Sequence, residues 1–567
     1  MDDFARLALE ERKLIVGIDF GTTFSGLAWA ETRRVEKIFN VAIESWPANI
    51  ETQEGTSSVK VPTEVRYTPQ GMEWGFQIPS TIKRHKWFKL GLAEGKVSNI
   101  DGQQKSSDDL TIDYLTVLVK HLMYTLEQKL GKAILQSIPI EFCLTVPAIW
   151  SEVAKDKTLK ACEKAGLKSK AGILLVSEPE AAAIYALHGL DPHGLQIGDC
   201  FVLCDAGGGT VDLISYTITD LHPILKIKEA ASGTGDLCGS TFLNRRFGDF
   251  LNAKLGKQPG WDSEILAEAL EKFDSIIKKQ YSPSATHQDG YHILVPGLAD
   301  DKDLGIKRGR FTITRTEMHD IFEPVVEKVI RLVEGQILAT NQTISAVLLV
   351  GGFGQNNYLK ERLRSSIGES IIVMQPPNAW TAVVRGAVMM ALARANSKLA
   401  TVNLVSRVAR KHYGIELATT YDSAKHDESK KYWSDAGKLF GVNVMAWLIK
   451  KGDPVEESKP IKIHYDSYFL VSDGPLTTVD IDILCDEKSA IAPVHKGKPN
   501  VLKLATLTGD LSHLEKSDLE KMITTRNDGK KYYAVKLAIE ATFHSASTTY
   551  VLLFHGKRYD TVTAEYV

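Results

Sequence analysis

Two short Gly–Thr segments, each beginning at an aspartate that ends an apolar run, contain the residues of this chain that are best suited to chemistry. The first is Asp19-Phe20-Gly21-Thr22-Thr23, and the second is Asp205-Ala206-Gly207-Gly208-Gly209-Thr210-Val211-Asp212. Glycine has no Cβ, so its backbone turns tightly and brings N–H groups against phosphate oxygens. Threonine hydroxyls add donors, and a carboxylate tolerates a polyphosphate beside it when a divalent cation lies between them. The two segments together predict a nucleotide held from both sides of a cleft.

A third segment has the pattern of a surface for a base or ribose. The apolar run 346–350 leads into Gly351-Gly352-Phe353, and Leu359 and Leu363 follow at helical spacing. A buried strand that enters a Gly-Gly turn and then a helix lets a flat ring lie against bare backbone.

In this order the segments resemble the nucleotide fold shared by actin, sugar kinases and heat shock protein 70, and within it the DnaK-type chaperones. Two more segments match that family, Leu144-Thr145-Val146-Pro147-Ala148 and Ser177-Glu178-Pro179-Glu180. The resemblance implies an α/β fold with a two-lobed, actin-like ATPase domain at 12–396. Lobe I would take about 12–195 plus 375–396, lobe II about 196–374, and two smaller subdomains would lie near 48–108 and 235–312. A helix is expected over 378–395, packed back on lobe I.

After residue 400 the apolar pattern changes to a period of two. Val479, Ile481 and Ile483 alternate with aspartates, and Val535, Leu537 and Ile539 alternate with Lys536, Ala538 and Glu540. Such alternation predicts antiparallel sheet. Segments 413–417, 448–454 and 531–567 resemble the DnaK-type substrate-binding sandwich. The expectation is a linker at 397–410 and a β-sandwich-like substrate-binding domain at 411–567.

Three departures from the family pattern point to its divergent member-12-like branch. The helical lid of typical members has no counterpart before the last residue, so a lidless domain is expected. The linker stretch 399–407 has no acidic residue. The lysine that relatives place four residues after a glycine is not found, because counting from Gly75 gives Pro79, with Lys83 and Arg84 further on.

The resemblance implies a role for each matching residue. Asp19 and Asp205 would hold Mg²⁺, largely through water, and Glu178 would orient or deprotonate the attacking water with Asp212 close by. Gly351, Gly352 and Phe353 would face adenosine. ATP or ADP would also contact the following residues: Gly21, Thr22, Thr23, Gly207, Gly208, Gly209, Thr210, Gly239, Lys278, Lys279 and Ser282. Binding of the adenine base is expected to be altered, because Gln355 and Trp380 stand where relatives have an arginine and an aspartate. The glutamate that relatives have on the base-side helix is also replaced, near Asp274 or Ser275.

Simpler interpretations stay open for several of these residues. Glu178 could be a helix-entry charge favoured by the helix dipole, and Lys278 with Lys279 could be a solvated helix face. The basic run 83–89 is interpreted as a solvated face, with the alternative that it reaches phosphates across the cleft. His412 and His464 are interpreted as ordinary surface or half-buried residues.

Composition limits the partners. The chain of 567 residues carries 68 basic and 70 acidic side chains, so no nucleic-acid partner is indicated. Its six cysteines show neither metal-ligand nor disulfide-scaffold spacing. The start, residues 1–13, is too acidic for a signal peptide, and no apolar stretch reaches membrane-spanning length. A cytoplasmic, or also nuclear, compartment is expected.

Three functions are compatible with these patterns. The first is a weakly ATP-hydrolysing chaperone that binds extended polypeptide or a protein partner and uses J-domain or nucleotide-exchange co-chaperones. The second is a nucleotide-gated scaffold with little turnover. The third is a small-molecule kinase of the same superfamily, against which the β-rich second half and the Glu178-Pro179 segment both argue.

Overall fold

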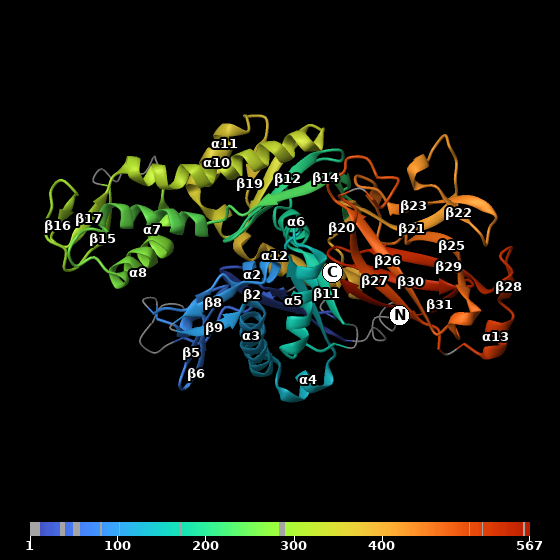
Figure 1. Ribbon diagram of the computed structural model, residues 1–567. Coiled ribbons are helices and arrows are strands. Elements are labelled where there is room, and N and C mark those ends of the chain that lie inside the picture. Colours follow the sequence, from blue (N-terminus) through green and yellow to red (C-terminus); the bar gives the residue numbers. More distant parts are fainter. Residues whose placement is uncertain are drawn as a thin grey trace. The chain divides into compact units, whose positions relative to one another are not determined.

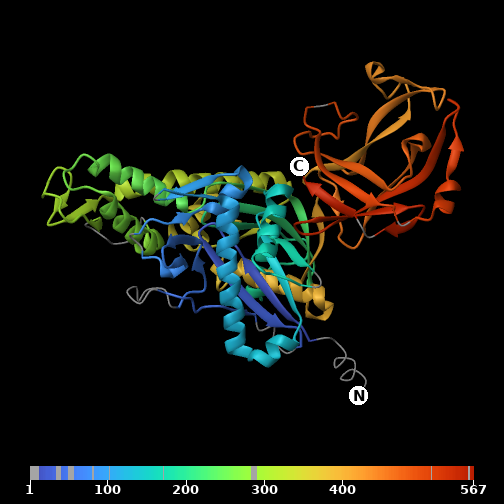
Figure 2. The same ribbon diagram turned by 60° about the horizontal axis from the view of Figure 1, so that its bottom comes forward.

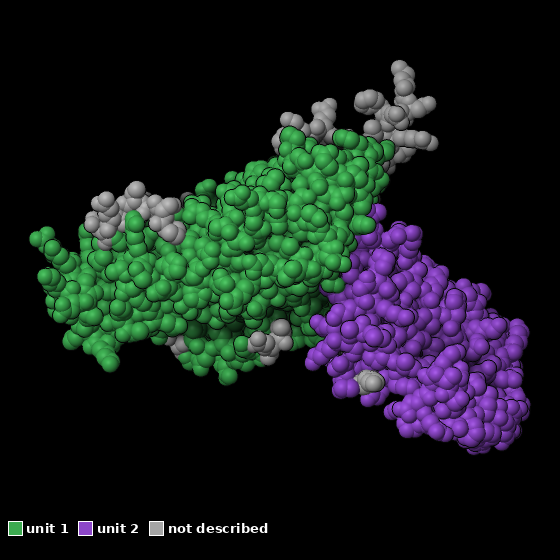
Figure 3. All heavy atoms as spheres, turned by 90° about the horizontal axis from the view of Figure 1, so that it is seen from above, with its two compact units in different colours: residues 1–404 green, residues 405–567 purple. Residues whose placement is uncertain are grey.

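The computed structural model describes residues 12–33, 40–48, 57–79, 82–100, 102–169, 172–282, 290–497, 499–512, 514–559 and 562–566. The initial segment 1–11, used in the argument against a signal peptide, lies outside these residues. The chain divides into two compact units, residues 1–404 and 405–567, which Figure 3 colours separately.

The first unit contains two principal sheets. The first sheet has the order β11-β10-β1-β2-β3, with β4 paired to β2. The parallel strands β11, β10 and β1 are almost wholly apolar, as expected of strands covered on both faces. The strand bounds are β1 Leu14–Asp19, β2 Phe24–Glu31, β3 Val41–Ala42, β4 Val61–Pro62, β10 Ile140–Val146 and β11 Ile173–Ser177.

The second sheet includes, in order, β19, β18, β12, β13 and β14. β12 pairs with β18 in parallel and with β13 antiparallel, so it is a central strand. The strand bounds are β12 Cys200–Ala206, β13 Val211–Asp220, β14 Leu225–Asp236, β18 Ile344–Val350 and β19 Ile372–Met374.

Helices α6 and α12 pack against each other (Figure 1). Helix α12 also contacts strand β1 of the first sheet, and α6 contacts strand β12 of the second. Gly386 of α12 lies so close to α6 that an added Cβ would overlap the carbonyl of Ala181. Gly17 of β1 likewise makes room for α12, since a Cβ there would lie 2.8 Å from the carbonyl oxygen of Val384. The helix expected over 378–395 is thus found as α12, Ala382–Ala395, after a 3₁₀ turn at Ala379–Thr381.

The remaining helices of the first unit surround the two sheets. The long helix α3 lies beside α5 in both ribbon views (Figures 1 and 2). Ser151 caps α5 by accepting a hydrogen bond from the Ala154 amide. The helix bounds are α2 Phe88–Glu94, α3 Ser107–Leu130, α4 Lys132–Ser137, α5 Glu152–Lys164, α6 Glu178–Gly189, α7 Thr241–Leu255, α8 Ser263–Lys272, α9 Lys278–Gln280, α10 Arg315–Thr340 and α11 Asn357–Ser366.

Small sheets complete the first unit. Strands β6-β5-β7 and the hairpin β8-β9 precede α3, and β15-β17-β16 lies between α9 and α10 in the chain. The bounds are β5 Glu64–Thr68, β6 Gly71–Trp74, β7 His85–Lys86, β8 Val97–Ile100, β9 Gln103–Ser106, β15 Tyr291–Leu294, β16 Ile306–Lys307 and β17 Arg310–Ile313.

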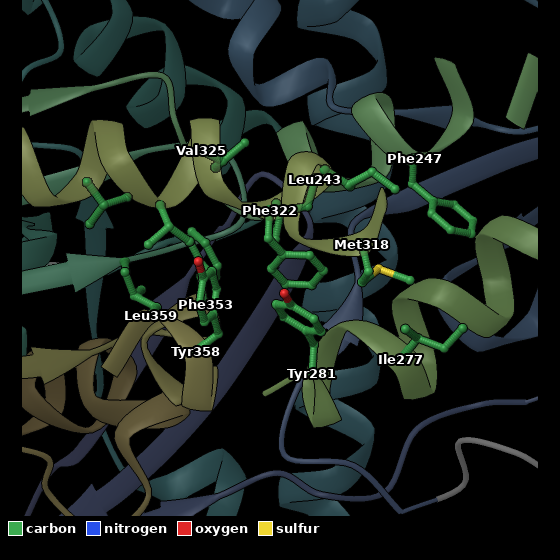
Figure 4. Close-up of a cluster of buried hydrophobic side chains, with 14 of the residues drawn as sticks. Leu243, Phe247, Ile277, Tyr281, Met318, Phe322, Val325, Phe353, Tyr358 and Leu359 are labelled. Carbon is green, nitrogen blue, oxygen red and sulfur yellow. The ribbon is translucent and has the colours of Figure 1, made fainter. Parts of the chain in front are cut away.

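An aromatic cluster packs together the helices that lie between strands β14 and β19 in the chain (Figure 4). The rings of Tyr281 and Phe322 have centroids 4.2 Å apart, and Tyr281 meets Tyr358 edge-on at 5.0 Å. These residues come from the end of α9, from α10 and from α11. Their packing holds the helical segment 273–280 against the core of the second sheet.

The second unit contains two further sheets. One has the order β22-β23-β21-β26-β27-β32, and the other is β25-β29-β30-β31 with β28 paired to β29. A single hydrophobic core takes Ile415, Ile483 and Leu507 from the former and Ile539 and Tyr550 from the latter. The strand bounds are β21 His412–Thr420, β22 Tyr432–Ser434, β23 Leu439–Ile449, β25 Ile461–Leu470, β26 Thr478–Asp486, β27 Leu502–Asp510, β28 Ile523–Thr525, β29 Lys531–Phe543, β30 Thr548–Phe554, β31 Lys557–Tyr559 and β32 Val562–Tyr566, with a short helix α13 at Lys516–Glu520. Strand β20, Val402–Val408, spans the boundary between residues 404 and 405, and its last two residues pair with β24, Pro454–Val455.

The α/β class and the change to sheet after residue 400 match the expectation, with two local corrections. Glu540, which alternates with the apolar residues of its strand, is itself buried, and Lys462 and Arg558 both pair with its carboxylate. His412 is also buried, since its ring accepts a hydrogen bond from the Lys451 amide and bonds the Ser489 carbonyl. His464 is exposed, as expected.

Candidate nucleotide-binding and catalytic site

The two Gly–Thr segments predicted to hold phosphate lie in direct contact. A Cβ placed on Gly208 would overlap Thr23 Oγ1, and one placed on Gly209 would lie 2.8 Å from Thr22 Oγ1. Strand β1 ends at Asp19 and strand β12 ends at Ala206, directly after Asp205, so each segment is the turn that leaves its strand. Glycine is required at 208 and 209 because the two turns approach each other through bare backbone.

The Gly351-Gly352 turn reaches the same place. Gly351 has a φ of +85°, and a Cβ there would overlap the carbonyl of Ala206 and lie 2.5 Å from Asp205 Oδ1. Gly239 also joins, because its amide donates to the Gly209 carbonyl at 3.1 Å. The amide of Thr241 at the start of α7 donates to the Gly208 carbonyl at 2.9 Å. Four separate glycine segments therefore converge on one point.

Four carboxylates lie around these glycine segments, those of Asp19, Glu178, Asp205 and Asp212. Asp205 and Asp212 are directly opposite each other in the β12–β13 pair, and both are buried. Burial raises the pKa of Asp205 well above its usual range, and the neighbouring carboxylates of Glu178 and Asp212 raise it further. Like charges directly opposite in a sheet repel. The cluster therefore has a strong attraction for cations.

Lys60 supplies one cation to this cluster. Its Nζ lies 2.6 Å from Asp19 Oδ2, and the lysine is only 7 % exposed. Lys60 directly precedes β4, whose pairing with β2 brings it beside Gly26. A Cβ on Gly26 would lie 3.3 Å from the Lys60 Cγ, so the absence of a side chain at 26 makes room for the lysine stem.

Lys89 supplies the second cation. Its Nζ lies 2.7 Å from Glu178 Oε1, and Lys89 is 2 % exposed. The ammonium also lies 5.2 Å from the ring centre of Trp150 and 5.7 Å from that of Phe20. Burial raises the pKa of Glu178, and the positive charge of Lys89 opposes that rise without cancelling it. Glu178 opens helix α6, after Ser177, whose side chain makes no capping hydrogen bond to the helix.

Among the residues expected near the adenine base, Lys278 and Ser282 bond to neighbouring protein side chains. The Lys278 ammonium pairs with Asp274 and donates to Asn244 Oδ1 at 3.1 Å, while Lys279 is exposed. Ser282 donates to Glu361 Oε2 at 3.3 Å. The Phe353 side chain belongs to the hydrophobic core of the second sheet, so its backbone is what it could offer a nucleotide.

Trp380 changes the surface beside the Gly-Gly turn. A Cβ on Gly352 would lie 3.1 Å from the indole Nε1, and the Trp380 ring meets Phe24 edge-on at 5.3 Å. Gln355 is exposed. Trp380 thus places an indole against the turn where relatives are expected to have an aspartate, and altered binding of the base stays a prediction.

The donor chemistry of the site fits a hard divalent cation. Mg²⁺ prefers carboxylate oxygens and keeps several waters, and such oxygens are supplied by Asp19, the last residue of β1, and by Asp205, the last but one of β12. Among the described residues, no group of three or more His, Cys, Asp or Glu side chains is arranged around one metal position. The residues therefore fit an ion held largely through water by Asp19 and Asp205.

The sequence analysis did not identify Lys60 and Lys89 as site residues. The search for the expected lysine counted along the chain from Gly75 to Pro79, whereas the structure brings a lysine to Glu178 from helix α2. The available signal was the basic run 83–89, because Lys89 is its last residue and the alternative that the run reaches phosphates pointed here. The prediction of a solvated face is wrong for Lys89.

Comparisons with known proteins identify the family of this chain. A model described as "Hsp70 protein" matches residues 89–430, and a domain of unknown function matches residues 407–567. The first match covers more than half of the chain, and the chain belongs to the Hsp70 family. The chain is thus an ATP-binding, Hsp70-like protein.

Within that family the chain falls in the 12-like branch. It is 24% identical to heat shock 70 kDa protein 12A of Homo sapiens, over 88% of this chain and 85% of that protein. Human heat shock 70 kDa protein 12B is 24% identical over 80% of this chain and 78% of its own length. The chaperone protein DnaK of Deinococcus proteolyticus is 24% identical over 71% and 63%. The resemblance drawn from the motifs is confirmed.

The described helices include none that is both long enough and apolar enough to cross a membrane. The six cysteines are free and buried.

Proposed function

We propose that this chain is an ATP-hydrolysing, chaperone-like protein whose bound nucleotide biases a β-rich unit that binds extended polypeptide. One observation carries the nucleotide half of the proposal. The two Gly–Thr turns touch at Gly208 and Thr23, and the buried Lys89–Glu178 pair lies in the same carboxylate cluster. Such a set offers N–H and hydroxyl donors for phosphates together with a candidate base for water.

The chain's own residues would divide the work. The backbone of 207–209 and the hydroxyls of Thr22, Thr23 and Thr210 would hold phosphate oxygens from both sides. Glu178 would orient the attacking water or accept its proton, and Lys89 would fix the carboxylate in place. Mg²⁺, when bound, would neutralise phosphate charge beside Asp19 and Asp205. Stabilising charge at preorganised donors is the main source of rate in such reactions.

The polypeptide half of the proposal rests on an exposed aromatic hairpin. β22 is the edge strand of its sheet, and the β22–β23 hairpin pairs Trp433 with Phe440. Trp433 is 50 % exposed and Phe440 46 %, and their rings meet edge-on at 5.0 Å. An open strand edge can pair with an extended peptide through main-chain hydrogen bonds, and neighbouring apolar side chains can select its residues. We propose that this hairpin binds apolar, extended segments in a lidless β-sandwich-like domain at 411–567, following an ATPase domain at 12–396.

Calorimetry with ATP and ADP in excess Mg²⁺ tests the nucleotide half. We expect binding by the wild type, and weaker, less Mg²⁺-dependent binding by Asp205→Asn. Glu163→Gln, an exposed carboxylate on α5, is the matched control and should bind as the wild type does. Absence of adenine-nucleotide binding at micromolar concentration would refute the proposal.

A second function, a nucleotide-gated scaffold with little turnover, is favoured by one specific observation. Glu178 and Asp19 are each paired with a buried lysine, and a carboxylate engaged by an ammonium is a weaker base. Single-turnover measurement of ATP cleavage separates the two functions. Nucleotide that stays intact on the protein would support the scaffold, and steady release of phosphate would support the chaperone cycle, in which J-domain and nucleotide-exchange co-chaperones are the implied partners.

A further inference from the structure

Lys60 is the residue of the site that the proposed function does not require. It comes from the chain between β3 and β4, outside every glycine segment that converges on the site. Its stem passes Gly26, which is opposite Asp19 in the β1–β2 pair, and its ammonium then reaches Asp19 Oδ2 at 2.6 Å. Strand register and a missing side chain at 26 thus aim this lysine at one carboxylate.

The ion pair between Lys60 and Asp19 changes the charge of the site as well as its packing. Asp19 is one of the two carboxylates suited to hold Mg²⁺ through water, and it is already neutralised by a buried ammonium. An ammonium has three N–H donors, and among the described residues Asp19 is the one acceptor bonded to Lys60 Nζ. The remaining donors lie where an anion held by Thr22 and Thr23 would come close, because those residues follow Asp19 in the same turn.

We propose that Lys60 is a built-in cation of the nucleotide site, which binds a phosphate oxygen beside Asp19 and makes nucleotide affinity only weakly dependent on Mg²⁺. The inference rests on the proposed nucleotide site and adds a residue that sets its cation requirement. A charged lysine beside Asp19 performs part of the neutralisation that a divalent ion performs elsewhere. Lys60 is a binding residue in this proposal, and Glu178 keeps the chemical role.

A structural ion pair is the competing explanation, and it predicts a different result. If Lys60 only holds β4 against β2, its replacement would lower stability and affinity equally with and without Mg²⁺. If Lys60 binds phosphate, its replacement would raise the Mg²⁺ requirement itself. The ratio of dissociation constants in EDTA and in Mg²⁺ therefore separates the two explanations, whereas either constant alone does not.

The test measures dissociation constants of the full chain for ATP and ADP by calorimetry, in excess MgCl₂ and in excess EDTA. For the wild type we expect the ratio of the two constants to stay below about tenfold. For Lys60→Gln we expect that ratio to grow by on the order of tenfold or more, the strength of a hydrogen bond to a charged group. Lys60→Arg keeps the charge and should keep the wild-type ratio. Lys120→Gln, at an exposed position of α3, is the matched control.

Each outcome decides the inference. A wild-type ratio of about a hundredfold or more would overturn it, as would equal ratios for wild type and Lys60→Gln. Failure of the wild type to bind either nucleotide in Mg²⁺ would refute the proposed function and remove this inference with it. Circular dichroism verifies folding of each variant, and if Lys60→Gln does not fold, the wild-type ratio remains the test, because a ratio of about a hundredfold or more overturns the inference.

Discussion

Lys89 Nζ lies 2.7 Å from Glu178 Oε1, and both side chains are buried. The two residues are separated by 89 positions in the chain, so the pair fastens helix α2 to the first residue of helix α6. Breaking a buried pair by removing one partner costs about 3–5 kcal/mol, because an uncompensated charge is left behind. The candidate base and its cation therefore form one unit.

Replacement of Glu178 by alanine is expected to slow ATP hydrolysis and to leave ATP affinity nearly unchanged. A general base contributes roughly 10²- to 10⁴-fold, and a slow ATPase will show the lower end. Single-turnover phosphate release and calorimetry measure the two quantities, with Glu163→Ala as the control. Equal losses of rate and affinity would show that Glu178 is structural. Lys89→Met should raise the pKa of Glu178 further, since the charge and hydrogen bond of Lys89 that oppose the effect of burial would be lost, and should move the acid limb of the rate profile to higher pH.

Replacement of Gly208 by alanine is expected to weaken ATP binding about tenfold. The added Cβ would overlap Thr23 Oγ1, and overpacking of a tight contact costs about 1–3 kcal/mol. Gly335→Ala is the matched control, because that glycine lies in helix α10 with nothing within 4 Å of an added Cβ. The control should bind ATP normally and gain stability. Unchanged affinity of Gly208→Ala would mean that the two turns do not meet when nucleotide binds.

Peptide affinity is expected to be weak and to depend only slightly on nucleotide. Coupling requires that ATP and peptide each favour one of two arrangements, and the stretch 399–407 lacks the acidic group of its relatives. We expect a coupling free energy of about 1 kcal/mol. Fluorescence titration of an extended apolar peptide measures it, using the full chain with ATP, with ADP and without nucleotide, and residues 400–567 alone. Identical affinities in all four states would eliminate the chaperone cycle, and Trp433→Ala should weaken every one of them.

Stability is expected to fall as pH drops below about 6.5, the ordinary pKa of histidine. Burial lowers the pKa of His85, and the nearby charge of Lys105 lowers it further. The folded chain therefore binds fewer protons than the unfolded chain in that range, so the free energy of unfolding decreases with falling pH. Urea unfolding of wild type and His85→Gln at neutral and mildly acidic pH measures this, and the variant should lose less stability. An equal loss would show that His85 does not contribute.

The sequence alone was sufficient to predict the candidate site residues that belong to a local pattern along the chain. Asp19 with its Gly–Thr turn, and Asp205 with its own, are local patterns, and each lies at a strand end as expected. Lys60 and Lys89 could not be assigned from local pattern, because their partners are 41 and 89 residues away. The same reason explains Glu540, whose burial depends on Arg558 from another strand. Tertiary packing decides which of many lysines enters a site.

Helix α12 has a consequence for how the chain is made. It fills the space left by Gly17 on the first strand and packs on α6, yet it is encoded by residues 382–395. At about 5–20 residues per second, a ribosome needs roughly 20–80 seconds to reach that helix. During that time the apolar face of β1 has no permanent cover, so a protein of a chaperone family would itself depend on protection while it is being synthesised.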